Sequence, residues 1–371
     1  MSNSWSAAAY NKPVQNVSSA HGNHRVLQMA MTLLVAFTLH GECVAQSSSS
    51  AQSQASPSIT TTTNLVIVPA LVRAPSADSL QMLKASDFLL TDNGVAQAVT
   101  LENVEHQPLA VLVLLQTGGA ADEQLPSYAK LGTMLTYLTE NHPHRVALLS
   151  FDSQPEYAWD FTPRVSDLED GFLHPRRGDG GAAILDAVDY GIDLLSKQPP
   201  TYRRIILLIS QTRDDNSSVK AEEVIRRLGE NNITIECLAF SPEKAWLKEQ
   251  FTKPRHENAP YQYAPNLPPL LHTFNLGEPL GVALKAMRED TSATVATLSG
   301  GESLPFASKA ELEEQLAVLA NHFANTYSLS FRPTSKAPGF HSLQLRIAGH
   351  PDFQISARAS YWATGDGGAA K

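Results

Sequence analysis

Two apolar runs without alternation stand out along the chain, and each has the length of a strand. Residues 111–115 are all Val or Leu and lead into Gln116, and residues 205–209 are all Ile or Leu and lead into Ser210 and Gln211. Such runs are typical of parallel strands that are buried on both faces. Ligands of an open α/β sheet bind just beyond the carboxyl ends of these strands. We therefore expect any binding site near Gln116 and Gln211.

Segments with helical periodicity alternate with further strand-like runs. In chain order these are helix 125–140, strand 145–151, helix 184–195, strand 204–210, helix 219–229, strand 232–240, helix 279–289 and helix 308–325. Strands that alternate with helices predict an α/β fold with a doubly wound, mostly parallel sheet flanked by helices. We place this domain at residues 108–300 and a final helix region at residues 301–326.

Shorter strand patterns flank the predicted α/β domain. They occupy residues 64–107 and 327–363, and a strand is expected at 353–361 near the end of the second segment. Asn93-Gly94 favours the positive φ angles of a tight hairpin. We expect the N- and C-terminal strands to pack together as a small β-rich domain.

The N-terminal region has the pattern of an export signal. An apolar segment at residues 26–39 follows Arg25 and precedes Cys43-Val44-Ala45, which suits cleavage before Gln46. A membrane-spanning helix needs about 20 apolar residues, so a cleaved signal peptide is favoured over a span. We expect an exported protein, periplasmic or extracellular, with no membrane span after cleavage.

Several segments lack any periodicity and are expected to form no regular structure. They are the Ser/Gln/Thr linker at 46–63, the Pro-rich insert at 241–280 with its aromatic residues, and the tail at 364–371. The aromatic residues of the insert favour either a peptide-contacting surface or attachment of the loop to the domain.

Charge and cysteine content narrow the function classes. The 371 residues carry a net charge of −9, so the basic surface of a nucleic-acid-binding protein is not expected. After cleavage Cys237 would be the single cysteine, which excludes an internal disulfide. Because Cys237 lies in a strand-like run, we expect it to be a small buried side chain rather than a reactive thiol.

In its order of strands and helices the chain resembles the von Willebrand factor A (vWA) domain, most closely the secreted A-domain-related proteins of Acidobacteria. The resemblance covers residues 64–363. It implies a metal site with Asp-x-Ser-x-Ser after the first strand, a Thr in a later loop and an Asp after the fourth strand. We call the corresponding positions of this chain the degenerate site: Gln116, Gly118, Ala120, Ala182 and Gln211. Mg²⁺ and Ca²⁺ need oxygen ligands that include carboxylates, so the substitutions predict no metal and no cofactor here.

The two glutamines of the degenerate site suggest a replacement for the ion. In the resembled family the first and fourth strands are neighbours, which would bring Gln116 and Gln211 face to face. Two amides can each donate and accept a hydrogen bond. We hypothesise that a Gln116–Gln211 hydrogen bond holds the turn closed; the alternative is two solvated polar residues at strand ends.

The loops around the degenerate site are candidate partner-binding segments. They span residues 117–124, 174–183 and 211–218, and their candidate contact residues are Thr117, Gly119, Arg177, Asp179, Thr212, Asp214 and Asp215. Asp214-Asp215-Asn216 has two interpretations, a relocated cation site or capping of a helix N-terminus. Arg177-Gly178-Asp179 spells an integrin-binding tripeptide, a match short enough to recur by chance.

Catalytic motifs are absent from the sequence. It contains no Gly-x-Ser-x-Gly elbow, no phosphate-binding Gly-x-x-x-x-Gly-Lys loop and no His-Glu-x-x-His helix. His142 and His144 are too few ligands for zinc and are expected to be exposed turn residues. The sequence thus predicts an exported, non-catalytic protein that binds an unidentified protein partner. The alternatives are metal-assisted adhesion through Asp214 and Asp215, and a structural component of the cell envelope.

Overall fold

The computed structural model describes residues 65–73, 83–102, 107–240, 279–324, 326–335, 337–350 and 352–364. The predicted signal peptide and linker lie outside these described residues, and so do residues 241–278 of the Pro-rich insert and the tail after residue 364. All described elements belong to one compact unit within residues 61–371.

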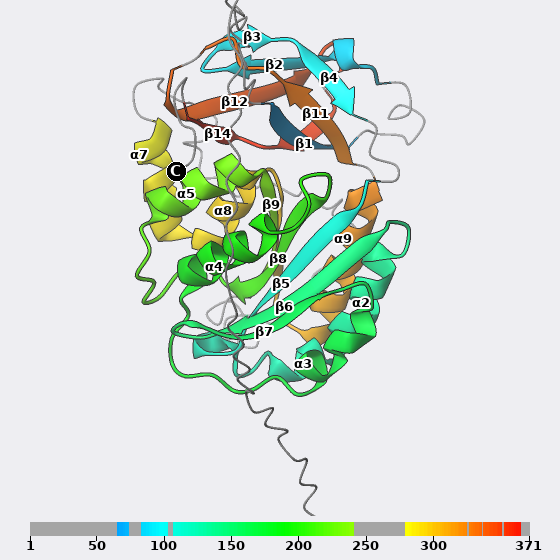
Figure 1. Ribbon diagram of the computed structural model, residues 1–371, viewed down its shortest axis with the longest axis vertical. Helices are drawn as coiled ribbons and strands as arrows, with labels where there is room; N and C mark the ends of the chain where they lie inside the picture. Colours follow the sequence, from blue (N-terminus) through cyan, green and yellow to red (C-terminus); the bar gives the residue numbers. More distant parts are fainter. Residues whose placement is uncertain are drawn as a thin grey trace, which may run out of the picture. The chain divides into compact units, whose positions relative to one another are not determined.

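A six-stranded sheet forms the centre of the α/β part (Figure 1). In sheet order its strands are β10 (Ser303–Phe306), β9 (Ile233–Phe240), β8 (Arg203–Gln211), β5 (Leu109–Gln116), β6 (His144–Phe151) and β7 (Pro155–Thr162). Every pairing is parallel except that of β6 with β7. All residues of β5 and β9 are buried, because helices cover both faces of the sheet.

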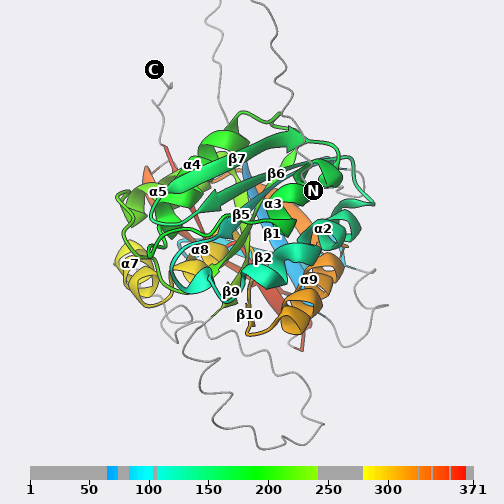
Figure 2. The same cartoon turned by 90° about the horizontal axis from the view of Figure 1, so that it is seen from below.

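Two groups of helices cover the two faces (Figures 1 and 2). One face packs against α4 (Ile184–Ser196), α5 (Ala221–Asn231), α7 (Pro279–Glu289) and α8 (Thr291–Ser299). The other packs against η3 (Leu125–Lys130), α2 (Leu131–Thr139), η4 (Val165–Leu168), α3 (Glu169–Leu173) and α9 (Lys309–Ala324). The predicted α/β class with a mostly parallel sheet is confirmed.

Besides η4, α3 and the short helix η2 (Gly119–Ala121), three elements of the α/β part did not emerge from the sequence. The first two are β7, a half-exposed edge strand, and β10, whose pairing with β9 extends this part of the fold past Gly300. The third is α8, in which most side chains are buried, so it has no polar face to reveal its period. Its ends carry the signals instead: the Asp290 carboxylate accepts from Ala293 N at 2.9 Å, and Gly300 ends the helix at φ +93°.

The remaining strands form two four-stranded antiparallel sheets. One contains β13 (Gln354–Ala357), β1 (Val66–Arg73), β11 (Thr326–Phe331) and β4 (Val99–Glu102). The other contains β14 (Ser360–Ala363), β12 (Gly339–Ile347), β2 (Phe88–Asp92) and β3 (Val95–Gln97), with the short helix η1 (Ala85–Asp87) before β2. Both sheets contribute to one buried cluster, as expected for a small β-rich part built from N- and C-terminal strands.

Two local features of the β-rich part bear on the predictions. The hairpin between β2 and β3 turns at Asn93 (φ +47°) and Gly94 (φ +83°), as predicted. The strand expected at 353–361 is instead two strands in different sheets, β13 and β14, separated by Arg358 and Ala359. Between the two strands, the Arg358 side chain reaches the end of α5.

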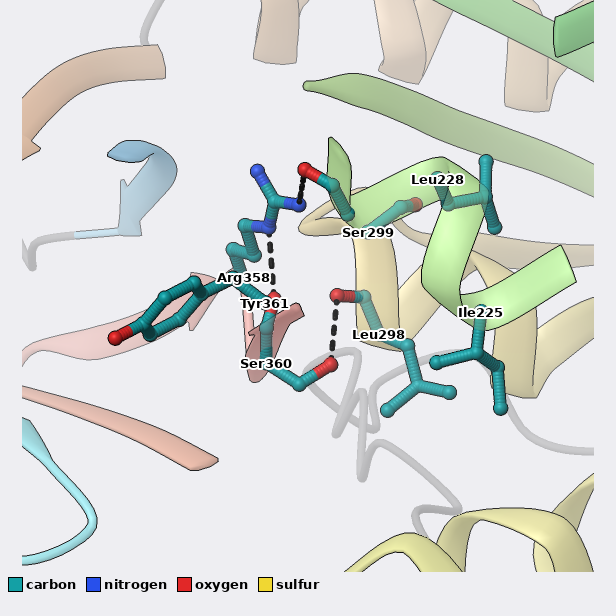
Figure 3. Close-up of a pocket in the computed structure, with 8 residues that line it drawn as sticks. Ile225, Leu228, Leu298, Ser299, Arg358, Ser360 and Tyr361 are labelled. Carbon is teal, nitrogen blue, oxygen red and sulfur yellow. Dashed lines mark hydrogen bonds between the residues drawn. The ribbon is translucent and has the colours of Figure 1, made fainter. Parts of the chain in front are cut away.

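Arg358 joins the β-rich part to the end of α5. Its guanidinium donates to Gly229 O at 3.2 Å, Asn232 Oδ1 at 3.0 Å and Ile67 O at 3.1 Å. Figure 3 shows the side chain directed at the last turn of α5, beside a hollow with room for about one water molecule. Burial lowers the pKa of Arg358 to about 10. A cation is favourable at this position because the free carbonyls of a helix carboxyl end carry partial negative charge.

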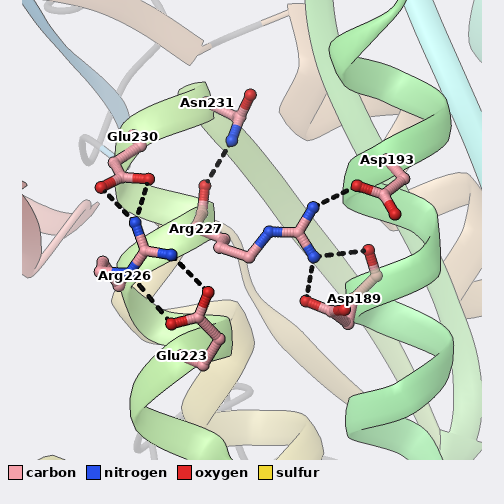
Figure 4. A network of polar contacts seen from close by, with 7 residues as sticks. All are labelled: Asp189, Asp193, Glu223, Arg226, Arg227, Glu230 and Asn231. Atoms are coloured by element: carbon pink, nitrogen blue, oxygen red, sulfur yellow. Dashed lines mark hydrogen bonds and ion pairs between the residues drawn. The ribbon is translucent and has the colours of Figure 1, made fainter. Parts of the chain in front are cut away.

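A charged network joins α4 to α5 on the surface (Figure 4). Arg227 of α5 pairs with Asp189 and Asp193 of α4, while the neighbouring Arg226 pairs with Glu223 and Glu230 within its own helix. None of the helices among the described residues is long and apolar enough to cross a membrane.

Candidate functional site

The degenerate site lies at the carboxyl ends of β5 and β8. These strands are adjacent and parallel, and Leu115 pairs with Ile209, so both end at the same edge of the sheet. The expectation that the first and fourth strands of this sheet are neighbours is confirmed.

Gln116 and Gln211 are joined by two hydrogen bonds. Gln116 Nε2 donates to Gln211 Oε1 at 3.0 Å, and Gln116 Oε1 accepts from the backbone N–H of Gln211 at 2.8 Å. The second hydrogen of Gln116 Nε2 goes to Gly118 O at 2.9 Å. The side-chain hydrogen bond predicted from the sequence is confirmed. Because Gln116 is fully buried, these bonds satisfy an amide that has no access to water.

Gly118 occupies a place with no room for a side chain. A Cβ atom at this position would lie 2.4 Å from Asp152 Cβ and 2.7 Å from the carbonyl oxygens of Asp179 and Gly181. The serine of the resembled motif therefore cannot be accommodated here without movement of the surrounding backbone. Two backbone hydrogen bonds join loops 117–124 and 174–183 at this point: Gly119 N donates to Asp179 O at 2.8 Å, and Gly178 N donates to Thr117 O at 3.0 Å.

Ala120 and Ala182 complete the degenerate site without contributing side-chain oxygens. Ala120 lies in the short helix η2 (Gly119–Ala121), half-buried against the core. Ala182 is buried, and its carbonyl accepts from Asp215 N at 2.9 Å. The three loops around the site are thus tied together by backbone hydrogen bonds.

Three of the candidate contact residues are buried or half-buried in this arrangement. Thr117 is only 1% exposed and its hydroxyl donates to Phe151 O at 3.2 Å, so it does not belong to the exposed loop surface. Gly119 adopts φ +56°, a conformation that favours glycine, and is half-buried. Thr212 is also half-buried, and its carbonyl accepts from Ser292 N at 3.1 Å.

The Arg-Gly-Asp tripeptide is folded back on the protein. Arg177 forms an ion pair with Asp122, and this contact lowers the pKa of the Asp122 carboxyl. The Asp179 carboxylate accepts from Ser153 Oγ at 2.5 Å and from Gly181 N at 2.8 Å, which lowers its pKa. Both charged groups hold loop 174–183 in place, and both side chains stay exposed on its outer surface.

Asp214 caps a helix, but not the one that follows it in the sequence. Its carboxylate accepts from Leu185 N in the first turn of α4 at 2.9 Å and from Ser217 Oγ at 2.5 Å. In return Asp186 of α4 accepts from Ser218 N at 3.0 Å, which fixes the loop before α5. The capping interpretation is confirmed, because the Asp214 carboxylate accepts from a free N–H group at the start of a helix, although that helix is α4.

The donor set does not fit a divalent cation. Among the described residues no group of three or more His, Cys, Asp or Glu side chains could hold a metal ion. The side-chain oxygens of Gln116 and Gln211 already accept hydrogen bonds. Asp215 is exposed, and its backbone pairs with Ala182.

Sequence reasoning missed Asp152 and Ser153, which are central to the site. Asp152 follows β6, is 3% exposed, and accepts from Asp179 N at 3.0 Å and from Gln154 N at 3.2 Å. Desolvation and then the Asp152 carboxylate raise the pKa of the nearby Glu156. The available signal was position: polar residues directly after a third buried strand lie at the same edge as Gln116.

Two other sequence candidates lie away from the site. Cys237 is buried in β9, as expected, and burial raises the pKa of its thiol to about 12, which keeps it protonated. His142 and His144 are half-buried rather than exposed, and His144 Nδ1 hydrogen-bonds the His142 carbonyl at 2.8 Å.

Comparisons with known proteins give weak structural likeness only. No family model matches the chain, and no curated protein matches its sequence. Among solved structures, proximal thread matrix protein 1 from the mussel byssus is similar over 59% of this chain, with 12% identity and a TM-score of 0.40. This chain covers 48% of that mussel protein, about half its length.

Two bacterial structures show a comparable degree of likeness. The conserved hypothetical protein BatB from Bacteroides thetaiotaomicron has 14% identity and a TM-score of 0.34; the match covers 57% of this chain and 99% of BatB. The PilB minor pilin from Streptococcus sanguinis has 11% identity and a TM-score of 0.36, with 60% and 63% of the two chains covered.

Proposed function

We propose that this protein is an exported, non-catalytic, vWA-like protein-binding protein that recognises its partner without a metal ion. The Gln116–Gln211 pair is the observation that carries the proposal. The two amide side chains lie at the carboxyl ends of β5 and β8, and two of their hydrogen bonds are made within the pair. A cation would have to displace these bonds and would find no carboxylate at the five positions of the degenerate site.

Recognition in this proposal uses the outer surface of loops 117–124, 174–183 and 211–218. The exposed side chains of these loops include Glu123, Arg176, Arg177, Asp179, Asp215, Asn216 and Ser218. Backbone hydrogen bonds between the loops fix this surface before a partner arrives. Such preorganisation favours binding, because little loop entropy is lost on association.

Crosslinking in the native envelope followed by capture with surface variants tests the proposal. Glu123→Lys and Asp215→Lys reverse charges on the loop surface, and Glu222→Lys makes the same change on α5 as a matched control. We expect the two loop variants to lose the crosslinked partner and the control to keep it. If all three keep the partner, the α/β part acts as a scaffold and the loop proposal is wrong.

Partner capture with and without a chelator distinguishes this proposal from metal-assisted adhesion. Capture in the presence of EDTA should equal capture in Mg²⁺, since the proposed contact contains no ion. Loss of the partner in EDTA, reproduced by replacing Asp214 and Asp215 with Asn, would instead favour the cation-dependent alternative.

A further inference from the structure

A surface hollow lies between α2 and the η4–α3 segment and shares no lining residue with the degenerate site. It encloses about 300 Å³, at the lower end of the volumes of small-ligand sites. Its floor is apolar and includes the buried Val165 and Phe172. Gly132 of α2 leaves the floor open, because a Cβ there would only just reach the Phe172 ring, at 3.5 Å.

The rim of the hollow is polar and aromatic. Tyr137 lines it and is 60% exposed, more than any other large hydrophobic residue in the described part of the chain. Glu169 lines the hollow from α3, and Thr133 and Ser166 line it as well. The Glu169 carboxylate and the Tyr137 hydroxyl have no hydrogen-bond or ion-pair partner within the described part of the chain.

Glu169 differs in this respect from the acids around it. Asp167 pairs with Arg164, and Asp170 lies 3.0 Å from His174 Nδ1. On the neighbouring helices, Glu313 pairs with Lys130. Glu169 thus presents an uncompensated negative charge to the hollow, on a protein whose net charge is −9.

We propose that this hollow binds an arginine side chain of a partner protein. A guanidinium is planar, stacks on an aromatic face and pairs with a carboxylate through two parallel N–H donors. Tyr137 supplies the aromatic face, Glu169 the carboxylate, and the floor at Phe172 accepts the aliphatic part of the side chain. The hollow shares no lining residue with the loop surface, so the proposal for one can be wrong without affecting the proposal for the other.

The test follows Tyr137 by fluorine NMR in the full chain labelled with 3-fluorotyrosine, with Tyr137→Phe used to assign its resonance. The probes are the N-acetyl amides of arginine, lysine and glutamine. We expect the arginine probe to shift the Tyr137 resonance saturably, in the millimolar range that a single side chain supports. The glutamine probe should leave the resonance unchanged.

Variants locate the contact within the hollow. Glu169→Gln should weaken arginine binding about tenfold, through loss of a charge-assisted contact. Gly132→Leu should abolish it by filling the floor, while unchanged circular dichroism shows that the fold is retained. Glu222→Gln, an exposed change on α5, should have no effect.

Three results would overturn the proposal. They are no shift with arginine, an equal shift with glutamine, and full binding by both Glu169→Gln and Gly132→Leu. An equal response to lysine would show that the hollow selects cations in general, and the assignment to arginine would then be wrong.

Discussion

Replacement of Gln116 by leucine tests whether the amide pair holds the edge of the sheet together. Leucine has nearly the volume of glutamine, so the change removes hydrogen bonds without opening a large cavity. Two groups of Gln211 lose their partner: the N–H, now 2.8 Å from Gln116 Oε1, and the side-chain Oε1, now 3.0 Å from Gln116 Nε2. The Gly118 carbonyl keeps its bond from Ala121 N. An unsatisfied buried group costs about 1–3 kcal/mol, and Gln211 is only half-buried, so Gln116→Leu should lower the free energy of unfolding by about 1–3 kcal/mol.

A double-mutant cycle isolates the bond between the two side chains. Gln211→Leu alone removes the 3.0 Å contact between the two side chains. It keeps the backbone N–H of residue 211, which donates to Gln116 Oε1. The coupling energy between the two substitutions should therefore be about 1 kcal/mol, the value of one neutral hydrogen bond. Urea unfolding followed by circular dichroism measures each variant.

A control and a refuting result complete this test. Gln154→Leu makes the same chemical change at an exposed position in a nearby turn and should alter stability by less than about 0.5 kcal/mol. If Gln116→Leu is as stable as this control, or the coupling energy is zero, the amide pair does not hold the strand ends together.

Three further predictions concern other parts of the fold. Gly118→Ala should destabilise the protein by about 1–3 kcal/mol in thermal melting, because its Cβ would meet Asp152, whereas Gly180→Ala, with no atom within 4 Å, should be neutral. Asp214→Ala should cost about 1 kcal/mol in urea unfolding through loss of the α4 cap, equally with and without Mg²⁺. Desolvation raises the pKa of Glu236 from 4.5 to about 7, so its ionisation destabilises the fold as pH rises through this window. Glu236→Gln should therefore be more stable than the parent by roughly 3 kcal/mol at pH 8.5 and similar to it at pH 4.5; an equal difference at both pH values would contradict this.

The strands of the sheet were predictable because they depend on local sequence, and the amide pair was predictable from the strand order of the resembled family, in which the first and fourth strands are neighbours. Uninterrupted Ile, Leu and Val runs predict parallel strands, and a polar residue at the end of each run marks the edge where strands meet. The hairpin at Asn93-Gly94 was predictable for the same reason, since its conformation is set by two adjacent residues.

The remaining contacts join segments far apart in the chain. Asp214 caps α4 rather than α5, and Arg358, between β13 and β14, reaches the end of α5. Neither partner can be read from neighbouring residues. The packing of Asp152 against Gly118 depends likewise on the approach of three loops. The sequence showed a glycine where the resembled motif has a serine, but not that a side chain at this position would meet Asp152.

Isothermal titration calorimetry with Mg²⁺, Mn²⁺ and Ca²⁺ tests the central claim most directly. If the amide pair has replaced the ion, none of the three cations gives a saturable heat with the full chain. A saturable heat that disappears in Asp214→Asn/Asp215→Asn would contradict the account, because recognition at these loops would then depend on a cation.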